Sequence, residues 1–291
     1  MKNSFYALII ISLLFSCKSN IKQKAQDTAT TKAKSISIRS EALIKKFMPI
    51  IHGVWVKKDY IEDLSKTKSP YESSSFFSGV ACMQIENIGP KSDSLNIGYS
   101  LNNHEGSDFI LYFKNGQNAS SLKTNLSDYD LKGGFYELGY RIKNRDTILI
   151  LYLYDKRKVL KNSVQYIRVA NKALDENDAA WGIEYITNKK LLTGKYLLTD
   201  SKGKTANVSF FEDGNVLGFK GFEHYYLATD FGGGEPGDNL DEIIFDLNSK
   251  NPSHLKFKIN SDTISLYGTY LNRDSTELIA GKLKYRLVKQ K

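Results

Sequence analysis

The sequence predicts an all-β protein made of two tandem up-and-down antiparallel β-barrels, each of about eight strands and each preceded by a short helix. Two observations predict this class. Runs rich in Tyr, Phe, Ile, Leu and Val alternate with clusters of Gly, Asn, Asp and Ser along most of the chain. In addition, a Gly-x-aromatic motif follows an apolar pair twice, in "IIHGVW" from residue 50 and in "LLTGKY" from residue 191.

Two further matches in the same order indicate a tandem repeat. "DTILILYLY" from Asp146 matches "DTISLYGTY" from Asp262, and "QYIRV" from Gln165 matches "KYRLV" from Lys284. Three matching segments in the same order are stronger evidence for a repeat than any single matching segment. We therefore divide the folded part into a first barrel over residues 40–170, a linker with a short helix over 171–190 and a second barrel over 191–291.

A short helix is expected before each Gly-x-aromatic strand. Before the first, four apolar residues recur at helical spacing, Ser40 can cap the helix and Pro49 ends it; the four are Leu43, Ile44, Phe47 and Met48. Before the second, Trp181 and Tyr185 are four residues apart and follow Asp178, a candidate cap. A helix in both places is part of the repeat.

The strand that starts at Asp146 is apolar on both faces. We take one set of alternate residues as the inward face because it matches the second copy; the set is Ile148, Ile150, Tyr152 and Tyr154. Leu149, Leu151 and Leu153 then form an outward apolar stripe, which is normally covered. The covering element is a helix of the same chain or the second barrel, or else a separate partner.

The N-terminus predicts export and lipidation. Residues 1–16 have a lysine, an apolar run and a small residue before the break, which is typical of a signal peptide. The ending "LFSC" resembles a bacterial lipobox, which implies diacylglycerol on the Cys17 sulfur, cleavage before it and a further acyl chain such as palmitate on its amino group. The alternative is an ordinary secretion signal that contains a cysteine. Lys18 in place of aspartate, with no acidic cluster after it, favours an outer-membrane anchor that faces the periplasm.

The basic excess lies in the tether. The formal net charge is +9, and residues 18–48 hold eight basic residues against Asp27 and Glu41, so the remainder of the chain is close to neutral. Residues 17–39 are rich in Lys, Ser, Thr and Ala and hold no aromatic residue, which predicts a flexible segment. A basic segment beside a lipid anchor is attracted to anionic headgroups. Nucleic acid is not an expected partner.

These features resemble the lipocalins and the wider calycin group. Gly53 and Trp55 match the opening motif of that family, and Gly194 matches it with Tyr196 in the tryptophan position. The resemblance implies barrels of about eight strands and an arginine of the last strand packed over the tryptophan. The candidates are Arg168 and Arg286, whose positions differ by one residue when the copies are aligned on Tyr166 and Tyr285. A one-residue offset changes the face of a strand, so at most one of them plays this part.

No catalytic, metal or cofactor motif is found. The four histidines are not at ligand spacing, and we expect no metal site, no cofactor and no enzyme activity. Cys82 lies in an apolar run and is interpreted as core. The loop over residues 230–242 carries five carboxylates around four glycines. It is either a calcium site or a solvated loop at a barrel mouth, and we favour the solvated loop because the spacing fits no calcium loop.

The leading interpretation is a non-enzymatic envelope lipoprotein that binds a small apolar or amphipathic ligand in at least one barrel. The alternative is an envelope interaction or assembly lipoprotein whose filled barrels dock a protein partner. A third hypothesis is an enzyme that uses carboxylates inside one barrel. In each case the membrane is contacted through the lipid anchor.

Overall fold

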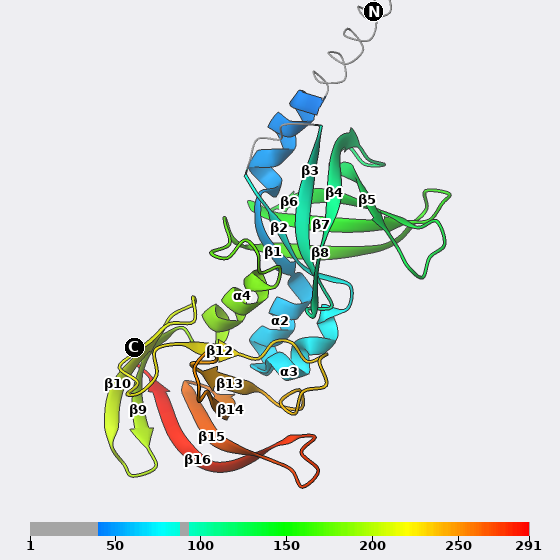
Figure 1. The fold of residues 1–291 in the computed structure, drawn as a ribbon. Coiled ribbons are helices and arrows are strands. Elements are labelled where there is room, and N and C mark those ends of the chain that lie inside the picture. Colours follow the sequence, from blue (N-terminus) through cyan, green and yellow to red (C-terminus); the bar gives the residue numbers. More distant parts are fainter. Residues whose placement is uncertain (1–39, 88–92, 291) are drawn as a thin grey trace, which may run out of the picture.

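The structure is a computed structural model, and it describes residues 40–87 and 93–290 (Figure 1). The expected signal peptide, the lipidated Cys17 and the basic tether lie outside the described residues. Within the described ranges, no helix is both long and apolar enough to cross a membrane.

The first helix covers residues 40–51 and confirms the helix expected before the first barrel. Phe47, Met48 and Ile51 are buried and belong to the core of the first barrel. The helix continues past Pro49, so the expectation that this proline ends it is wrong. Pro49 is exposed in the last turn, where the loss of one backbone hydrogen bond is small and the chain can still continue for two residues.

Eight antiparallel strands then form a closed barrel, in which each strand pairs with its neighbours in sequence and β8 pairs with β1. This confirms the first predicted barrel and is consistent with a lipocalin-like fold. The strands are β1 (Gly53–Lys57), β2 (Val80–Ile85), β3 (Ser94–Leu101), β4 (Glu105–Asn115), β5 (Ser121–Ser127), β6 (Phe135–Lys143), β7 (Asp146–Tyr154) and β8 (Leu160–Ala170).

Large side chains occupy the interior of this barrel. An eight-stranded barrel is just wide enough for its inward side chains to fill it. The buried residues that point inward include Trp55, Met83, Ile97, Phe109, Leu111, Phe113, Leu122, Leu138 and Tyr166. The Tyr166 hydroxyl donates a hydrogen bond to the Val80 carbonyl at 2.8 Å, so a polar group in this interior is also satisfied.

The face assignment on β7 is wrong. Leu149 and Leu151 are 0% and 2% exposed and lie in the barrel interior with Trp55. Ile150 and Tyr154 point outward instead and are also buried, and the Asn118 side chain donates to the Tyr154 hydroxyl at 3.0 Å. Both faces of β7 are apolar because both are buried, so alternation alone could not identify the inner face.

Three short helical elements are inserted between β1 and β2, where we expected loops and strands. They are α2 (Lys58–Thr67), α3 (Pro70–Ser73) and the 3-10 helix η1 (Ser74–Phe77). The apolar face of α2 consists of Tyr60, Ile61 and Leu64, which are all buried. The Ser69 hydroxyl accepts a hydrogen bond from the Glu72 amide at 3.0 Å and thereby caps α3.

The linker contains α4 (Trp181–Leu191), which confirms the helix expected before the second Gly-x-aromatic strand. Trp181 and Tyr185 stack on one another with ring centroids 4.9 Å apart. The Asp178 side chain accepts from the Ala180 amide at 2.8 Å, one residue before the helix begins.

The second unit has eight antiparallel strands but does not form a closed barrel. The expectation of two closed barrels is therefore wrong in the second half. The sheet order is β11-β10-β9-β16-β15-β14-β13-β12. The strands are β9 (Gly194–Asp200), β10 (Thr205–Phe210), β11 (Val216–Leu217), β12 (Tyr225–Leu227), β13 (Glu242–Phe245), β14 (Ser253–Asn260), β15 (Thr263–Leu271) and β16 (Leu278–Lys289).

The second sheet stays open because its two edge strands are short. β11 has two residues and β12 has three, so only an isolated bridge between Asn215 and His224 joins the edges. Gly218 has a φ of 80°, and Gly221 has a φ of 92°, so the chain between β11 and β12 turns repeatedly and does not extend into a ladder.

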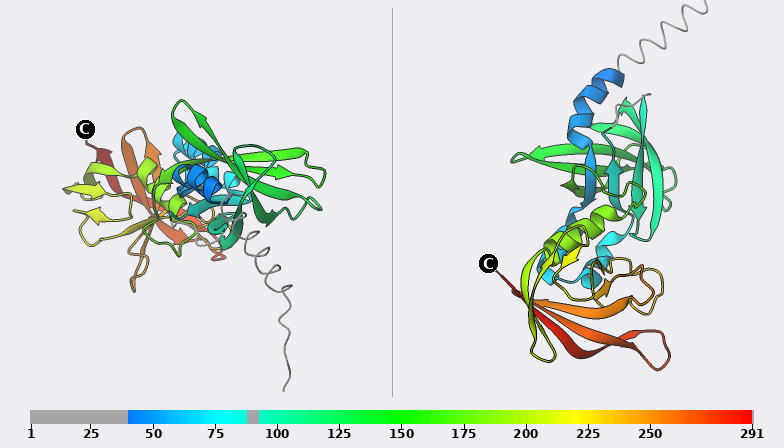
Figure 2. Two further views of the ribbon diagram at one scale, coloured as in Figure 1. Left: turned by 90° about the horizontal axis from the view of Figure 1, so that it is seen from above. Right: turned by 60° about the vertical axis from the view of Figure 1, so that its left-hand side comes forward.

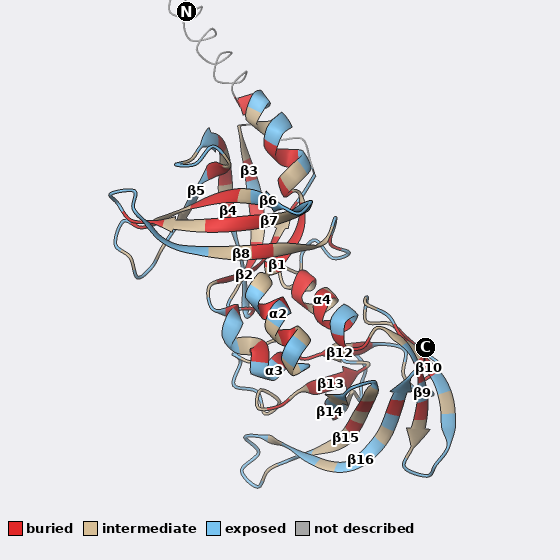
Figure 3. Ribbon diagram, turned by 180° about the vertical axis from the view of Figure 1, so that it is seen from behind, coloured by how far each residue is buried: buried red, intermediate tan, exposed pale blue. Residues whose placement is uncertain are grey.

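Helices α2, α3 and α4 lie between the barrel and the open sheet (Figures 1 and 2). One continuous core joins the three parts. It contains Val54, Val56 and Cys82 from the outer face of the barrel, together with the apolar residues of α2 and α4 and the inner face of the second sheet. The Tyr60 hydroxyl is hydrogen-bonded to Thr187 Oγ1 at 2.7 Å, which ties α2 to α4. Figure 3 shows buried positions continuing from the barrel through the helices into β13 and β14.

The Gly-x-aromatic motif closes one end of the barrel. The Trp55 indole donates to the Ile51 carbonyl at 2.7 Å, and the Arg168 guanidinium lies 4.8 Å from the centre of the Trp55 ring. Arg168 is therefore the arginine that the lipocalin resemblance implies. Gly53 has a φ of 121°, and a Cβ there would lie 2.8 Å from the Ala170 carbonyl oxygen, which explains why the motif starts with glycine.

The second motif makes the same set of contacts with different side chains. The Tyr196 hydroxyl donates to the Leu192 carbonyl at 2.7 Å, and Lys289 Nζ lies 5.9 Å from the centre of the Tyr196 ring. Arg286 pairs with Thr199 and Ser265 instead, so its candidacy for this role is wrong. Lys289 is opposite Tyr196 in the sheet just as Arg168 is opposite Trp55, and the alignment on Tyr285 missed this register.

The shared core predicts cooperative unfolding of both units. Leu64→Ala removes a fully buried side chain from α2 and should lower the free energy of unfolding by about 2–5 kcal/mol. Because α2 packs against both units, urea unfolding should remain a single transition by circular dichroism and by the fluorescence of Trp55 and Trp181. Leu174→Ala, at a side chain that is 75% exposed, is the control and should change stability by less than about 0.5 kcal/mol.

Two separate transitions, of which Leu64→Ala shifts only one, would instead support independent units. The boundary at residues 171–190 stays a prediction until that measurement.

Candidate functional site

Three cavities adjoin one another around Tyr226, outside the barrel. We name them by position. The loop pocket has a volume of about 480 Å³ and lies under the loop over residues 230–242. The cleft, of about 290 Å³, lies between the β3–β4 turn, the start of α4 and the chain after β12. The strand-end pocket, of about 580 Å³, lies beside the end of β13. Tyr226 lines all three cavities.

The loop pocket is formed on the outer face of β12–β14. Alternation places Tyr226, Ile244 and His254 on this face, whereas Leu227, Ile243 and Leu255 point to the inner core. Ala228, Leu271 and Leu278 add apolar wall, and the last two come from the β15–β16 hairpin. Four carboxylates complete the lining: Asp230, Glu235, Asp238 and Glu242.

The glycine-rich loop is ordered by its own side chains. Asp238 Oδ2 accepts from the amides of Gly234 and Glu235 at 2.8 and 3.1 Å. The Leu278 amide donates to the Pro236 carbonyl at 2.7 Å, which attaches the loop to the β15–β16 hairpin. Glu242 Oε1 lies 2.9 Å from His254 Nδ1, so this carboxylate has a partner at the floor of the pocket.

The loop does not assemble a cation site in the described part of the chain, where no group of three or more His, Cys, Asp or Glu residues is arranged to hold a metal ion. The Asp238 carboxylate accepts backbone hydrogen bonds and Glu242 pairs with a histidine. The solvated loop stays a prediction, and it lies over a pocket of the open sheet and not at the mouth of a closed barrel.

The cleft brings together segments that are far apart in the sequence. His104 Nδ1 in the β3–β4 turn lies 2.8 Å from Asp230 Oδ2. The Asn103 amide nitrogen donates to the Thr229 carbonyl at 2.6 Å. These two contacts fix the barrel to the second unit across 126 residues of sequence. Asp178 and Glu184 form the opposite wall, at the start of α4.

Carboxylates dominate the lining of the three cavities. No Lys or Arg is among the described residues that line them, and the basic side chains there are His104, His224 and His254. The carboxylates are Glu105, Asp178, Glu184, Glu223, Asp230, Glu235, Asp238, Glu242 and Asp246. A chain with a formal net charge of +9 thus has an acidic concave surface, which favours cationic groups.

Burial perturbs several of these groups. Desolvation raises the pKa of Glu184 to about 7, and the negative charge of Asp178 adds to the effect. Burial also raises the pKa of Asp178, and it raises the pKa of Tyr226 to about 12. The hydrogen bond with Asp230 raises the pKa of His104, so the protonated imidazole is favoured beside that carboxylate. Perturbed groups that gather at a cavity are typical of functional sites.

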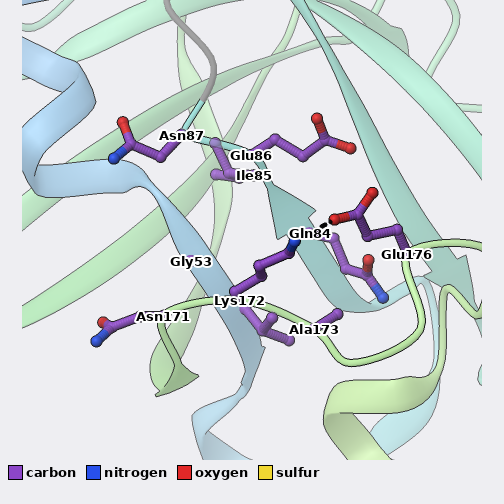
Figure 4. Close-up of a pocket in the computed structure, with 10 residues that line it drawn as sticks. Gly53, Gln84, Ile85, Glu86, Asn87, Asn171, Lys172, Ala173 and Glu176 are labelled. Atoms are coloured by element: carbon purple, nitrogen blue, oxygen red, sulfur yellow. Dashed lines mark ion pairs between the residues drawn. The ribbon is translucent and has the colours of Figure 1, made fainter.

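A fourth cavity lies where β1 and β2 meet the chain after β8 (Figure 4). It has a volume of about 190 Å³ and is lined by Gly53, Gln84 and the 171–176 segment, among others. Of its three charged side chains, Lys172 and Glu176 pair with each other at 2.8 Å and Glu86 is the third. This cavity is smaller than the three cavities around Tyr226.

The sequence identified only part of this site. Cys82 is buried against Gly182, and burial raises the pKa of its thiol to about 12, so its assignment to the core is confirmed. The loop over residues 230–242 was singled out and does line a cavity. Glu184 and His104 were missed as site residues, because nothing in the sequence indicates that these distant residues lie at one cleft.

Glu184 predicts a pH-dependent difference in stability. Burial raises its pKa from 4.5 to about 7, so between these values the folded state holds a proton that the unfolded state has released. The contribution of this carboxyl to stability therefore decreases as the pH rises from about 4.5 through about 7. Glu184→Gln should be more stable than the parent at pH 8, on the order of 1–2 kcal/mol after allowance for partial exposure, and about equally stable at pH 4.

Urea unfolding at the two pH values measures this difference. Glu277→Gln, at an exposed carboxylate of the β15–β16 hairpin, is the matched control and should show no such pH-dependent gain. A Glu184→Gln variant that is less stable at pH 8 would show that the carboxylate is stabilised in the folded protein.

Comparisons with known proteins give no family for this arrangement. No protein-family model matches the chain, and no curated protein matches its sequence. The candidate site is therefore defined by its own geometry: an apolar pocket and an acidic cleft that meet at Tyr226 and Asp230.

Proposed function

We propose that the protein is a non-enzymatic envelope lipoprotein that binds a small amphipathic ligand in the loop pocket. The observation that carries this proposal is the lining of that pocket. Ala228, Ile244, Leu271 and Leu278 offer an apolar surface, and carboxylates surround it. Ligand pockets in proteins are mostly apolar, with a few polar groups that orient the ligand, and have volumes of about 300–1,000 Å³.

This position differs from the barrel interior, where we expected the ligand. The first barrel is filled by aromatic and aliphatic side chains, so a ligand there would have to displace several of them. The inner face of the second sheet packs on α2 and α4 in the common core. The outer face of β12–β14 is the surface that keeps both an apolar floor and open volume.

The proposed anchor is compatible with access to this pocket. The helix over residues 40–51 lies at the far side of the barrel from the second sheet (Figure 1). An acylated Cys17 would hold the chain at the membrane through the basic tether, with the second unit on the side away from the anchored helix. We propose the outer membrane, with the folded part facing the periplasm, from the residues that follow Cys17.

The second candidate function is docking of a protein partner. The filled barrel agrees with it, and so do the exposed apolar side chains on the β15–β16 hairpin, where Tyr270 is 55% and Leu283 is 44% exposed. Ile279 of the same hairpin is 39% exposed. Clustered exposed apolar residues are typical of interaction surfaces.

The anchor is tested by Cys17→Ser. The parent should sediment with membranes and should carry a lipid-modified N-terminal peptide in mass spectrometry, because several acyl chains make anchoring effectively permanent. Cys17→Ser should move the protein to the soluble fraction. Cys82→Ala is the matched control, since the second cysteine is buried, and it should stay with the membrane. A Cys17→Ser protein that remains membrane-bound would contradict lipid anchoring at this residue.

The loop pocket is tested with the neutral fluorescent probe N-phenyl-1-naphthylamine. The parent should enhance its fluorescence saturably, and Leu271→Ser should weaken binding about fivefold, because an apolar contact is lost. Leu283→Ser is the matched control, since Leu283 has a similar exposure on the same hairpin but does not line the pocket. Equal effects of the two substitutions, or no saturable binding by the parent, would count against the loop pocket as the ligand site.

A further inference from the structure

We propose that the ligand carries a primary ammonium group and that the cleft between the barrel and the second unit binds this group. The inference rests on the proposed function for the apolar part of the ligand, which occupies the loop pocket. It adds the chemistry of the head group and the residues that recognise it: Glu184 and Asp178 as the anionic groups, with Asn103 and Ser100 as neutral acceptors.

Two carboxylates that line the cleft have no cationic partner among the described residues. Glu184 is half-buried at the start of α4, and the described residues offer it no ion pair and no hydrogen bond. The Asp178 carboxylate interacts with the backbone amides of Ala180 and Trp181 and has no cationic partner among the described residues. A half-buried carboxylate is costly unless it is paired, so these two groups leave room for a cation from outside the chain.

Two buried polar atoms of the cleft also lack a hydrogen-bond partner. Asn103 and Ser100 are 4% and 2% exposed, both line the cleft, and the atoms Asn103 Oδ1 and Ser100 Oγ have no hydrogen-bond partner. The Asn103 amide nitrogen is already used by the Thr229 carbonyl, so its free atom is the oxygen, which can only accept. Buried polar groups are normally satisfied, and an ammonium group supplies three donors.

The histidine and the third carboxylate beside it in the cleft are already paired with each other. His104 already pairs with Asp230 Oδ2, and Asp230 Oδ1 accepts from the Gly232 amide at 3.0 Å. Asp230 is thus occupied by the protein itself, whereas Glu184 across the cleft is not. Because no Lys or Arg lines the cleft, an anionic head group would meet several carboxylates and no strong cation.

The cleft adjoins the loop pocket. Tyr226 and Asp230 line both the cleft and the loop pocket, so the two cavities are adjacent. A ligand whose apolar chain lies against Ile244 and Leu278 therefore has the cleft next to one end of its pocket. A single amphipathic cation can satisfy the apolar surface and the unpaired acceptors at once.

The test compares three probes that share one alkyl chain: octylammonium, octanol and octanoate. Each displaces N-phenyl-1-naphthylamine from the full chain at pH 8, and isothermal titration calorimetry gives the affinities. We expect octylammonium to bind at least about tenfold more tightly than octanol, because a charge-assisted hydrogen bond in a partly buried site contributes that much, and octanoate to bind more weakly than octanol.

Two variants locate the head group. Glu184→Gln should remove most of the preference for octylammonium, on the order of tenfold, and leave octanol binding unchanged. Glu277→Gln, at an exposed carboxylate that lines none of the three cavities, should change neither. Urea unfolding checks that Glu184→Gln is folded, so weaker binding cannot be ascribed to loss of structure.

The outcomes separate this inference from the function on which it rests. If octanol and the fluorescent probe bind but octylammonium shows no preference, or if Glu184→Gln leaves the preference intact, the head-group assignment is overturned and the loop pocket stands. If none of the probes binds saturably, the proposed function itself fails.

Discussion

The insertion of α2 between the first two strands of the barrel is the feature on which the rest of the arrangement depends. Its apolar face packs into the same core as the inner face of the second sheet, and the hydrogen bond between Tyr60 and Thr187 joins it to α4. Apolar surface that would otherwise be exposed on the open sheet is therefore covered by helices. The sheet need not close on itself, and its outer face at β12–β14 is left to form cavities.

A different set of contacts fixes the end of each unit that carries the Gly-x-aromatic motif. In each unit an aromatic side chain hydrogen-bonds to the carbonyl four residues earlier, and a cation of the last strand lies over its ring. These contacts hold the aromatic ring in place at that end, although Arg168 Nε stays without a hydrogen-bond partner there. Among the buried polar atoms without a partner, Ser100 Oγ and Asn103 Oδ1 lie in the cleft at the junction of the two units.

Charge is distributed unevenly over the molecule. The basic residues are concentrated near the N-terminus, whereas the cavities around Tyr226 are lined by carboxylates and histidines. A positive segment suits a membrane surface, and an acidic concavity suits a cation. Burying Glu184 beside Asp178 reduces stability at neutral pH, and groups that are kept in spite of such a cost are frequently functional. The net charge of the whole chain therefore shows neither the basic segment near the N-terminus nor the acidic lining of the cavities.

The sequence by itself determined the elements whose causes are local. Residues around Phe47 formed the expected helix, the Gly-x-aromatic motifs opened β1 and β9, and Cys82 was assigned to the core. Tertiary structure decided the rest. Only the structure showed that Leu149 lies on the inward face of β7. Apolar residues are buried on both faces of this strand, so alternation in the sequence could not identify the inner face. The second sheet stayed open because its edge strands β11 and β12 have only two and three residues, and α2 and α4 cover its inner face. The cleft exists because His104 meets Asp230 and Asn103 meets Thr229 across 126 residues, and no local pattern encodes a contact at that separation.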